Sequence, residues 1–409
     1  MITEKRKALI IGCGIAGPTV ALFLQRAGID AEIYEAQSAP DDFAGVFLTV
    51  AANGMHVLKT LGLDDRITAE GFPTQQLVMW SSSGKRLGEV PVGAVAGQGV
   101  QSLTIKRGRL HRILREEAIR QGIKITFGKK LKAIESGDGH RVTAVFADGT
   151  IATGDLLIGC DGIHSRTRHF IDPHAPQPIF TGLVSGGGFG HTTAMPPTPE
   201  TVHMIFGKRA FFGYLIKPSG EIYWFENHAY PGEPRRPELE AIPQALWQQK
   251  LLNLHEGDQP FIREMIGQTE GDIGMYPIYD IATLPRWYKG PVILIGDAAH
   301  ATSPNAGQGA SLALEDAIVL ARCLRDVPSL ADAFVAYEQL RRERVEKVVQ
   351  FSRERGNNKA VANPIARWFR DLTLPFFLKY FANAESLAWL YAYQVEWDRS
   401  VTEIEDVPV

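Results

Sequence analysis

Two glycine-rich segments about 280 residues apart place the strongest constraint on what this chain can fold into. The first, at residues 12–17, has the sequence Gly-Cys-Gly-Ile-Ala-Gly and follows the apolar run 8–11. The second, at residues 296–300, has the sequence Gly-Asp-Ala-Ala-His and follows the apolar run 292–295. A short buried strand followed by a tight turn and a helix is typical of phosphate binding through backbone amides. Because an extended dinucleotide needs contacts at several points, the pair predicts that both segments hold one such molecule.

The three glycines of the first segment have separate expected roles. Gly12 permits the tight turn, Gly14 lets the backbone approach a pyrophosphate, and Gly17 lets the following helix pack on the sheet. The amides of Ile15 and Ala16, where that helix starts, are expected to attract the phosphate charge. One such motif does not distinguish NAD from FAD, but together with the second segment it favours FAD.

An acidic residue ends the next predicted strand at the spacing of a dinucleotide fold. Residues 31–34 form this strand, and Glu35 follows eighteen residues after Gly17. Its carboxylate is predicted to accept hydrogen bonds from the adenosine ribose hydroxyls, and a solvated strand end is the alternative.

Length, charge and cysteine usage narrow the class of protein. A chain of 409 residues exceeds one ordinary core, so two domains are expected, and a net charge of -3 argues against broad nucleic-acid binding. We see no secretion signal and no apolar run long enough to span a membrane. Cys13, Cys160 and Cys323 form no C-x-x-C pair, which argues against a metal site or a dithiol centre. Reduced thiols fit a cytoplasmic location.

The pattern of apolar residues changes in the middle of the chain. Residues 8–35 have strand–helix–strand order, whereas residues 176–275 contain alternating aromatic strands, and the nucleotide-type pattern returns at 291–325. We therefore predict an α/β fold in which a discontinuous FAD-binding Rossmann-type domain carries an inserted antiparallel β-sheet substrate domain and C-terminal helices. The predicted boundaries are 1–75, 101–175 and 276–330 for the FAD-binding domain, 76–100 and 176–275 for the substrate-binding domain, and 331–409 for the C-terminal helical region.

Three local predictions concern single segments. Residues 103–121 have the apolar spacing of a helix, and the strands near 123–127, 131–135 and 142–147 are expected to form a small meander. The apolar segment 365–381 is either a membrane-surface helix or, as the pattern favours, a helix pair packed on the body, because Pro375 is expected to break it.

With both glycine segments placed, the chain closely resembles the single-component FAD-dependent monooxygenases that have the fold of para-hydroxybenzoate hydroxylase. A third fingerprint, Gly-Cys-Asp-Gly-Ile-His-Ser at residues 159–165, lies between the other two, and the last runs on to Gly307-Gln308-Gly309. The resemblance implies that the turn at Asp161 lies near the FAD pyrophosphate and is linked to NAD(P)H use. It also implies that Asp297 binds the ribityl chain and that the helix start from Gly307 through Ala310 faces the flavin ring.

Two weaker matches and one departure complete the predicted cofactor site. Arg107, in the pattern I-x-R-x-x-L, is implied to contact the cofactor, with a helix-surface cation as the alternative. The backbone of Leu131 occupies the place where relatives meet the adenine. Ala36 stands where many relatives have a basic residue, so the adenosine contacts stay open there.

The resemblance implies a reaction in which NAD(P)H reduces FAD and the reduced flavin reacts with dioxygen to give a flavin hydroperoxide. One oxygen atom is then inserted into a small aromatic or cyclic substrate, by hydroxylation or epoxidation. Only one dinucleotide fold is visible, so NADPH or NADH is expected to bind transiently. A monomer and a homodimer are both compatible with the sequence.

Candidate substrate residues come from the aromatic strands. Phe206, Phe211, Tyr223 and Trp224 would suit a flat apolar ligand, although aromatic strands are usually core. As catalytic candidates, Arg209 is predicted to bind a phenolate or carboxylate, unless it is a solvated turn cation, and Tyr214 to polarise a substrate hydroxyl.

Other functions stay open at this point. A flavin reductase or halogenase would use the same fold, although the halogenase pattern W-x-W-x-I-P does not occur in the chain. A flavin-bound protein that holds a ligand without turnover is a further alternative. His300 is expected to be a structural hydrogen-bonding residue rather than a base.

Overall fold

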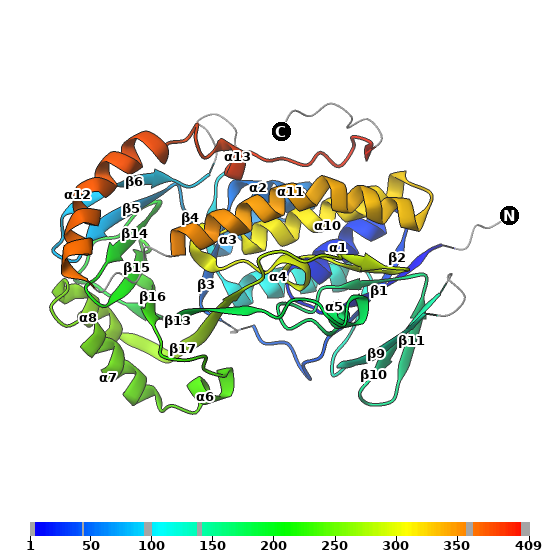
Figure 1. Cartoon of the computed structure of the whole chain (residues 1–409), viewed down its shortest axis with the longest axis horizontal. Helices are drawn as coiled ribbons and strands as arrows, with labels where there is room; N and C mark the ends of the chain where they lie inside the picture. The colour runs from blue at the N-terminus through cyan, green and yellow to red at the C-terminus, as the bar shows by residue number, and fades with distance from the viewer. Residues whose placement is uncertain (1–4, 43–44, 94–99, 137–140, 357–362, 402–409) are drawn as a thin grey trace.

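A computed structural model describes residues 5–42, 45–93, 100–136, 141–356 and 363–401. Two large β-sheets lie at opposite ends of the molecule, and long helices cover the nucleotide-type sheet (Figure 1).

The first large sheet is built from the apolar runs seen in the sequence. It has six strands in the order β18-β19-β12-β1-β2-β8, parallel except for β18, and the runs at 8–11, 156–158 and 292–295 are almost fully buried. Such runs are typical of parallel strands that are covered on both faces. The strands are β1 (Lys7–Ile11), β2 (Asp30–Tyr34), β8 (Lys124–Thr126), β12 (Leu156–Gly159), β18 (Tyr288–Lys289) and β19 (Val292–Leu294).

Helices α1 (Ala16–Arg26) and α10 (Gly309–Asp326) pack against each other over this sheet, and α11 (Leu330–Gly356) lies along α10 (Figure 1). The helices that follow the two glycine segments, α1 and α10, therefore pack on each other.

The predicted meander is partly wrong. The antiparallel three-stranded sheet consists of β9 (Leu131–Ser136), β10 (Val142–Phe146) and β11 (Ile151–Gly154), whereas residues 124–126 join β2 in the parallel sheet. Sequence periodicity alone does not show which neighbour a short strand will pair with.

The second large sheet has seven strands in the order β17-β13-β16-β15-β14-β5-β6, all antiparallel to their neighbours except the β14–β5 pair. Its segments, 76–91 and 179–280, lie within the predicted substrate domain except for residues 276–280, because β17 runs on past the predicted boundary at 275. The division into domains stays a prediction. The strands are β5 (Gln76–Ser81), β6 (Arg86–Pro91), β13 (Ile179–His191), β14 (Thr201–Phe206), β15 (Ala210–Ile216), β16 (Glu221–Ala229) and β17 (Thr269–Asp280).

One face of this second sheet packs against helices. Residues from α6 (Arg236–Glu240), α7 (Gln244–Leu254) and α8 (Pro260–Gly267) form a hydrophobic cluster with alternate residues of the strands. We call this the helix-covered face, and the other the open face.

A small sheet joins the two halves. It has the order β3-β7-β4, with β3 (Phe47–Val50), β4 (Phe72–Pro73) and β7 (Leu103–Lys106). The helix predicted over 103–121 therefore starts later than expected, because α4 covers Arg107–Arg120 and the residues before it form β7. The remaining short elements are α2 (Ala52–Thr60), α3 (Asp64–Glu70), α5 (Arg166–Ile171), α9 (Asp297–His300), η1 (Pro304–Ala306) and α13 (Ala388–Tyr391).

The predicted helix break at Pro375 is wrong. Helix α12 runs without interruption from Pro364 to Phe381 and packs on β6. A proline leaves the carbonyl four residues earlier without its helical donor, and here that carbonyl belongs to Asp371. The ammonium group of Lys85 donates to the Asp371 oxygen at 3.5 Å, which compensates for the missing bond.

Candidate cofactor and substrate site

In the first glycine turn, a side chain would find space at Gly14 but not at Gly12 or Gly17. A Cβ atom on Gly12 would lie 2.4 Å from the Cys160 carbonyl oxygen, and one on Gly17 would lie 2.0 Å from the Gly12 oxygen. Gly12 also has φ +108°, so packing and backbone conformation demand these two glycines. A Cβ on Gly14 would meet no atom within 4 Å, so the chain itself does not require glycine there. An approaching ligand explains Gly14 better.

The structure brings all three fingerprints together. Gly12 touches the second fingerprint through Cys160, and a Cβ on Gly296 would lie 3.3 Å from the Cβ of Ala16. The buried guanidinium of Arg168 donates to the carbonyls of Ile163 at 2.6 Å and Ala298 at 3.1 Å, which joins the second fingerprint to the third. Segments far apart in sequence therefore meet at one edge of the parallel sheet.

The predicted ribose acid lies beside the first turn. Glu35 accepts hydrogen bonds from the backbone amides of Cys13 at 2.7 Å and Gln37 at 2.9 Å, while Ala36 is exposed. The main chain of Glu35 also accepts from Lys129 at 2.7 Å, which brings the loop before Leu131 alongside. These contacts support the adenosine-binding roles predicted for Glu35, Ala36 and Leu131, which stay predictions.

Asp161 uses its carboxylate within its own turn. The two oxygens accept from the Ser165 hydroxyl at 2.5 Å, from the amides of Arg166 and Thr167 at 2.8 and 3.0 Å, and from the Thr167 hydroxyl at 3.1 Å. The side chain therefore shapes the start of α5, and a contact with the cofactor would fall to the backbone of this turn.

The second glycine segment offers an acid and a helix start. Asp297 is exposed to solvent, yet desolvation by the surrounding protein raises the pKa of its carboxyl group, as expected for a residue that lines a cleft. Gly307 has φ +64° and ends η1. The side-chain carbonyl of Gln308 accepts from the Asn53 side-chain amide at 2.9 Å and forms no cap on the first turn of α10. The amides of Gly309 and Ala310 thus lie at the positive end of an 18-residue helix.

A row of basic residues on α4 lies between the two glycine turns, and only Arg107, its first member, is predicted from the sequence. Arg107, His111 and Arg115 follow one another at four-residue spacing on one helix face. Burial raises the pKa values of Asp297 and Cys13, and the charges of Arg107, near Asp297, and Arg115, near Cys13, partly oppose that rise. The row therefore runs from the second turn to the first, where a diphosphate would carry its charge. Their i, i+4, i+8 spacing is the sequence pattern from which this basic helix face could have been predicted.

His111 gives this row a pH dependence that can be measured. Burial, followed by the charges of Arg107 and Arg115, lowers the pKa of His111 from 6.5 to about 4. Between these values the unfolded chain binds a proton that the folded chain does not, so stability falls as the pH falls. We expect wild-type apoprotein to lose about 2 kcal/mol more stability between pH 7 and pH 5 than His111→Gln does, by urea denaturation. Equal losses in both proteins would contradict the assignment.

Behind the second turn lies a buried network of charged residues. Asp316 of α10 accepts from the ring of His300 at 2.5 Å, from the Gly296 amide at 2.8 Å and from Arg341 of α11 at 2.8 Å. Arg341 also pairs with Glu315 at 2.7 Å, and Glu315 pairs with Arg344 at 2.8 Å. His300 is thus a structural hydrogen-bonding residue, as the sequence analysis favoured.

The open face of the second sheet is the one turned toward these turns. A Cβ on Gly187 of β13 would lie 2.7 Å from a methyl of Val46, and the Val46 carbonyl accepts from the Arg107 amide at 3.1 Å. Phe47, the next residue, contacts the ring of Phe225 with centroids 5.8 Å apart. Since successive residues of a strand point to opposite faces, Tyr223 and Asn227 share the open face with Phe225.

Two predicted residues, Tyr214 and Trp224, lie on the helix-covered face. Tyr214 and Trp224 belong to the cluster beneath α7 and α8: Tyr214 packs on Phe261, and the Trp224 ring nitrogen donates to Thr269 at 3.0 Å. Burial also raises the pKa of Tyr214 to about 12. This packing favours structural roles for both residues over the predicted ones, which stay predictions.

Arg209 has a structural partner. Its guanidinium donates to the backbone carbonyls of Asn253 and, at 3.1 Å, of Leu254, at the C-terminal end of α7. A cation satisfies the free carbonyls and the negative dipole at a helix end. The geometry therefore favours a capping role over the predicted substrate-binding one.

The other three aromatic candidates lie on the open face but are buried. Tyr223 packs with Phe47 and Phe189, while Phe206 and Phe211 contact each other with ring centroids 5.2 Å apart. Substrate contact by these residues stays a prediction.

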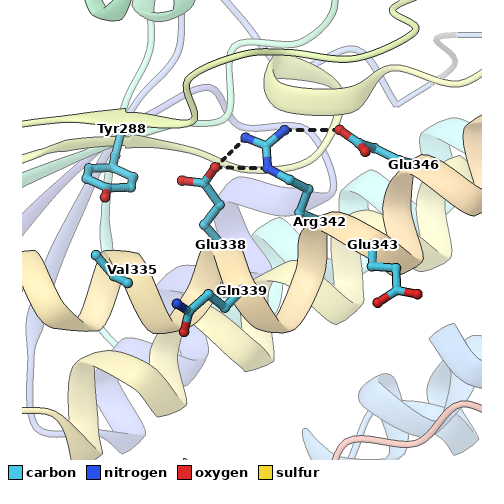
Figure 2. A pocket seen from close by; sticks show the side chains of 7 residues that line it. All are labelled: Tyr288, Val335, Glu338, Gln339, Arg342, Glu343 and Glu346. Carbon is cyan, nitrogen blue, oxygen red and sulfur yellow. Dashed lines mark hydrogen bonds and ion pairs between the residues drawn. The ribbon is translucent and has the colours of Figure 1, made fainter. Parts of the chain in front are cut away.

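Two surface grooves of the described residues do not contain the predicted cofactor residues. One of about 520 Å³ runs along the outer side of α11, where Arg342 bonds to Glu338 and Glu346 (Figure 2). Its walls carry more acids than bases, which does not suit a diphosphate. Within the described ranges, His, Cys, Asp and Glu side chains form no group that could hold a metal ion, and no helix is long and apolar enough to cross a membrane.

Comparisons with known proteins agree with this geometry. Residues 5–352 match the family described as "FAD binding domain". The aurachin C monooxygenase/isomerase of Stigmatella aurantiaca is 32% identical over 367 residues, which cover 89% of this chain and 92% of the relative. The FAD-dependent urate hydroxylase of Klebsiella pneumoniae is 30% identical over 85% of this chain and 89% of the relative.

A solved structure extends the similarity to three dimensions. Klebsiella pneumoniae HpxO complexed with FAD and uric acid superposes with a TM-score of 0.80 at 27% identity, over 91% of this chain and 93% of that one. The fold and the site thus define a flavoprotein oxidoreductase. The chain belongs to the FAD-binding family of flavin-dependent aromatic hydroxylases and monooxygenases.

Proposed function

We propose that this protein inserts one oxygen atom of dioxygen into a small flat ring compound, using NADPH or NADH as the electron donor. The observation that carries the proposal is the contact between the open face of the second sheet and the glycine turns through Val46 and Arg107. A ring held on this face would lie between the aromatic strands and the cofactor.

The residues fit FAD, whose bound flavin would supply the hydride acceptor and the activation of dioxygen. Gly14 leaves space for the diphosphate, and Arg107 and Arg115 would offset its charge. Asp297 would hold the ribityl chain. The start of α10 would stabilise negative charge on the flavin ring by about 1 kcal/mol through its dipole.

One side chain of the open face has a polar group without a partner. Asn227 is 2% exposed, and neither atom of its amide forms a hydrogen bond in the part of the chain that the structure describes. Its cross-strand neighbours are Ser185 and Phe211. Leaving a buried amide unpaired costs about 1–3 kcal/mol, so a substrate group that completes its bonding is favoured.

This amide suits a ring that carries a donor next to an acceptor. An asparagine side chain offers one carbonyl and one NH₂ group, which pair with a neighbouring N–H (or O–H) and C=O. Uric acid, bound by HpxO, has this arrangement. We therefore propose oxidised nitrogen heterocycles as the substrate class, ahead of purely apolar rings.

The test of the function is a panel of hydroxylated nitrogen heterocycles and phenolic acids. We expect a purified yellow protein in which one class stimulates NAD(P)H oxidation with matching oxygen uptake and an oxygenated product. Substrate reduction without oxygen uptake would indicate the reductase alternative. Flavin content without turnover of any ring would indicate a ligand-holding protein.

Replacing Asn227 separates substrate recognition from folding. We expect Asn227→Leu to raise the KM of the preferred heterocycle at least tenfold, about 1.4 kcal/mol, while FAD content stays unchanged. Trp224→Phe, on the opposite face of the same strand, should leave KM within about twofold. Unchanged KM in Asn227→Leu with lowered stability would assign the amide a structural role instead.

The cellular location belongs to the same proposal. The three cysteines are free, and burial raises the pKa of all three thiols, of Cys13 and Cys323 to about 12. Unreactive, unpaired thiols support a cytoplasmic protein.

A further inference from the structure

Helix α12 is amphipathic in the inverted sense, with its apolar side turned to solvent. Eight large apolar side chains of this helix are between 52% and 76% exposed, and none of its residues is buried. We call these eight residues the α12 apolar face: Ile365, Trp368, Phe369, Leu372, Phe376, Phe377, Tyr380 and Phe381.

Two arginines of α12, Arg367 and Arg370, point the other way. Arg367 donates to the Lys208 carbonyl at 2.6 Å, and Arg370 pairs with Asp371 at 2.8 Å and lies 4.5 Å from the centre of the Phe206 ring. Together with Leu374, which packs on Phe206 and Phe211, these residues fix which side of α12 faces the body. The orientation is therefore held by specific contacts.

The exposed apolar area is as large as one side of a stable interface. At about 200 Å² per large side chain, the eight residues present on the order of 900 Å² of apolar surface. The largest apolar patch of a typical monomer is about 300–600 Å², and a standard interface buries about 800 Å² per partner. Helix α12 lies at the outer edge of the molecule, where a second protein can reach it (Figure 1).

We propose that the α12 apolar face is the interface of a homodimer, with the same face of a second copy as its partner. Two copies related by a twofold axis would pair their α12 helices antiparallel, so that the same patch serves both sides. A polar rim is present in the adjoining groove of about 610 Å³, where Lys379 of α12 faces Arg86, Glu89 and Glu200.

A lipid surface fits this face less well. Helices that lie on membranes carry several Lys or Arg residues flanking the apolar side, which attract anionic headgroups. In α12, Arg367 and Arg370 are turned to the protein, and Lys379 is the cation of the exposed side. The exposed apolar area and the scarcity of cations beside it therefore favour a second copy of the chain over a lipid surface as the partner of this face.

The midpoint of α12 gives a sharp test. Leu372 lies near the centre of the helix, so in an antiparallel pair it faces Leu372 of the partner. In sedimentation velocity on the FAD-bound protein at about 1–100 μM, wild type should have twice the monomer mass. Leu372→Glu and Leu372→Lys should each halve that mass through like-charge repulsion, and an equimolar mixture of the two should restore the dimer.

Controls separate this result from misfolding. The double variant Ile119→Ser, Ile151→Ser removes exposed apolar residues of α4 and β11 and should stay dimeric. All variants should retain FAD. A monomeric wild type at 100 μM, or a dimer that persists in each Leu372 variant, would overturn the proposal. Monomeric wild type that co-sediments with phosphatidylcholine–phosphatidylglycerol vesicles would also overturn it and assign the face to lipid.

Discussion

Gly14→Val should fold normally and lose FAD. The added side chain enters space that no protein atom occupies within 4 Å, so the apoprotein has no internal clash to relieve. The same space is where the backbone is expected to approach the diphosphate, and hydrogen bonds to charged groups contribute about 1.5–3 kcal/mol each. We expect at least 100-fold weaker FAD binding, measured by flavin absorbance per protein and by titration of the apoprotein.

Gly267→Val is the matched control for this experiment. Gly267 ends α8, is exposed and also has no atom within 4 Å of an added Cβ. Its replacement should leave FAD affinity within about twofold. Wild-type affinity in Gly14→Val would mean that the first glycine turn does not hold the diphosphate.

Asp316→Ala should cause the largest loss of stability among single polar substitutions. It leaves Arg341, the ring of His300 and the Gly296 amide without their shared acceptor in a fully buried position. Breaking one partner out of a buried ion pair costs about 3–5 kcal/mol, because the remaining charge stays desolvated. Urea denaturation of the FAD-bound protein should show this loss, and FAD should dissociate more readily because Gly296 begins the second turn.

An exposed ion pair on the same long helix provides the comparison. Glu346→Ala removes one of the two carboxylates that pair with Arg342 on the outer side of α11, where solvent screens the charges (Figure 2). This change should lower the free energy of unfolding by less than about 1 kcal/mol. Similar losses of stability in both variants would show that the buried network does not stabilise the fold more than an exposed ion pair does.

The neighbouring cations also hold the pKa of the Asp316 carboxyl group below its ordinary value. The contribution of Asp316 to the free energy of unfolding is therefore present above that ordinary value and is lost only as the pH falls below it.

The parts of the site that depend on local backbone geometry could be predicted from the sequence. The turn at 12–17, Glu35 at the end of its strand and the start of α10 each follow from residue type and spacing within a few positions. Their convergence follows from strand order, because β12, β1 and β2 are adjacent and parallel and so end at one edge.

The errors concern contacts that local sequence does not encode. Alternation predicts that Tyr223 and Trp224 lie on opposite faces, but the side that meets the cofactor depends on where Val46 and α7 pack. Arg209 caps a helix that follows 35 residues later, and only the tertiary fold brings the two together. His111 and Arg115 lie near the glycine turns because of the orientation of α4, and the pattern of apolar residues does not predict that orientation.

The order in which the site is assembled limits when the flavin can be acquired during synthesis. The first turn is synthesised long before residues 296–298, so Gly296 can pack on Ala16, and Ala298 can accept from Arg168, only once β19 has been made. A nascent chain that ends near residue 280 would therefore lack half of the binding groove. We therefore expect FAD to bind only after α10 has been synthesised, and chains stalled before that point should be colourless.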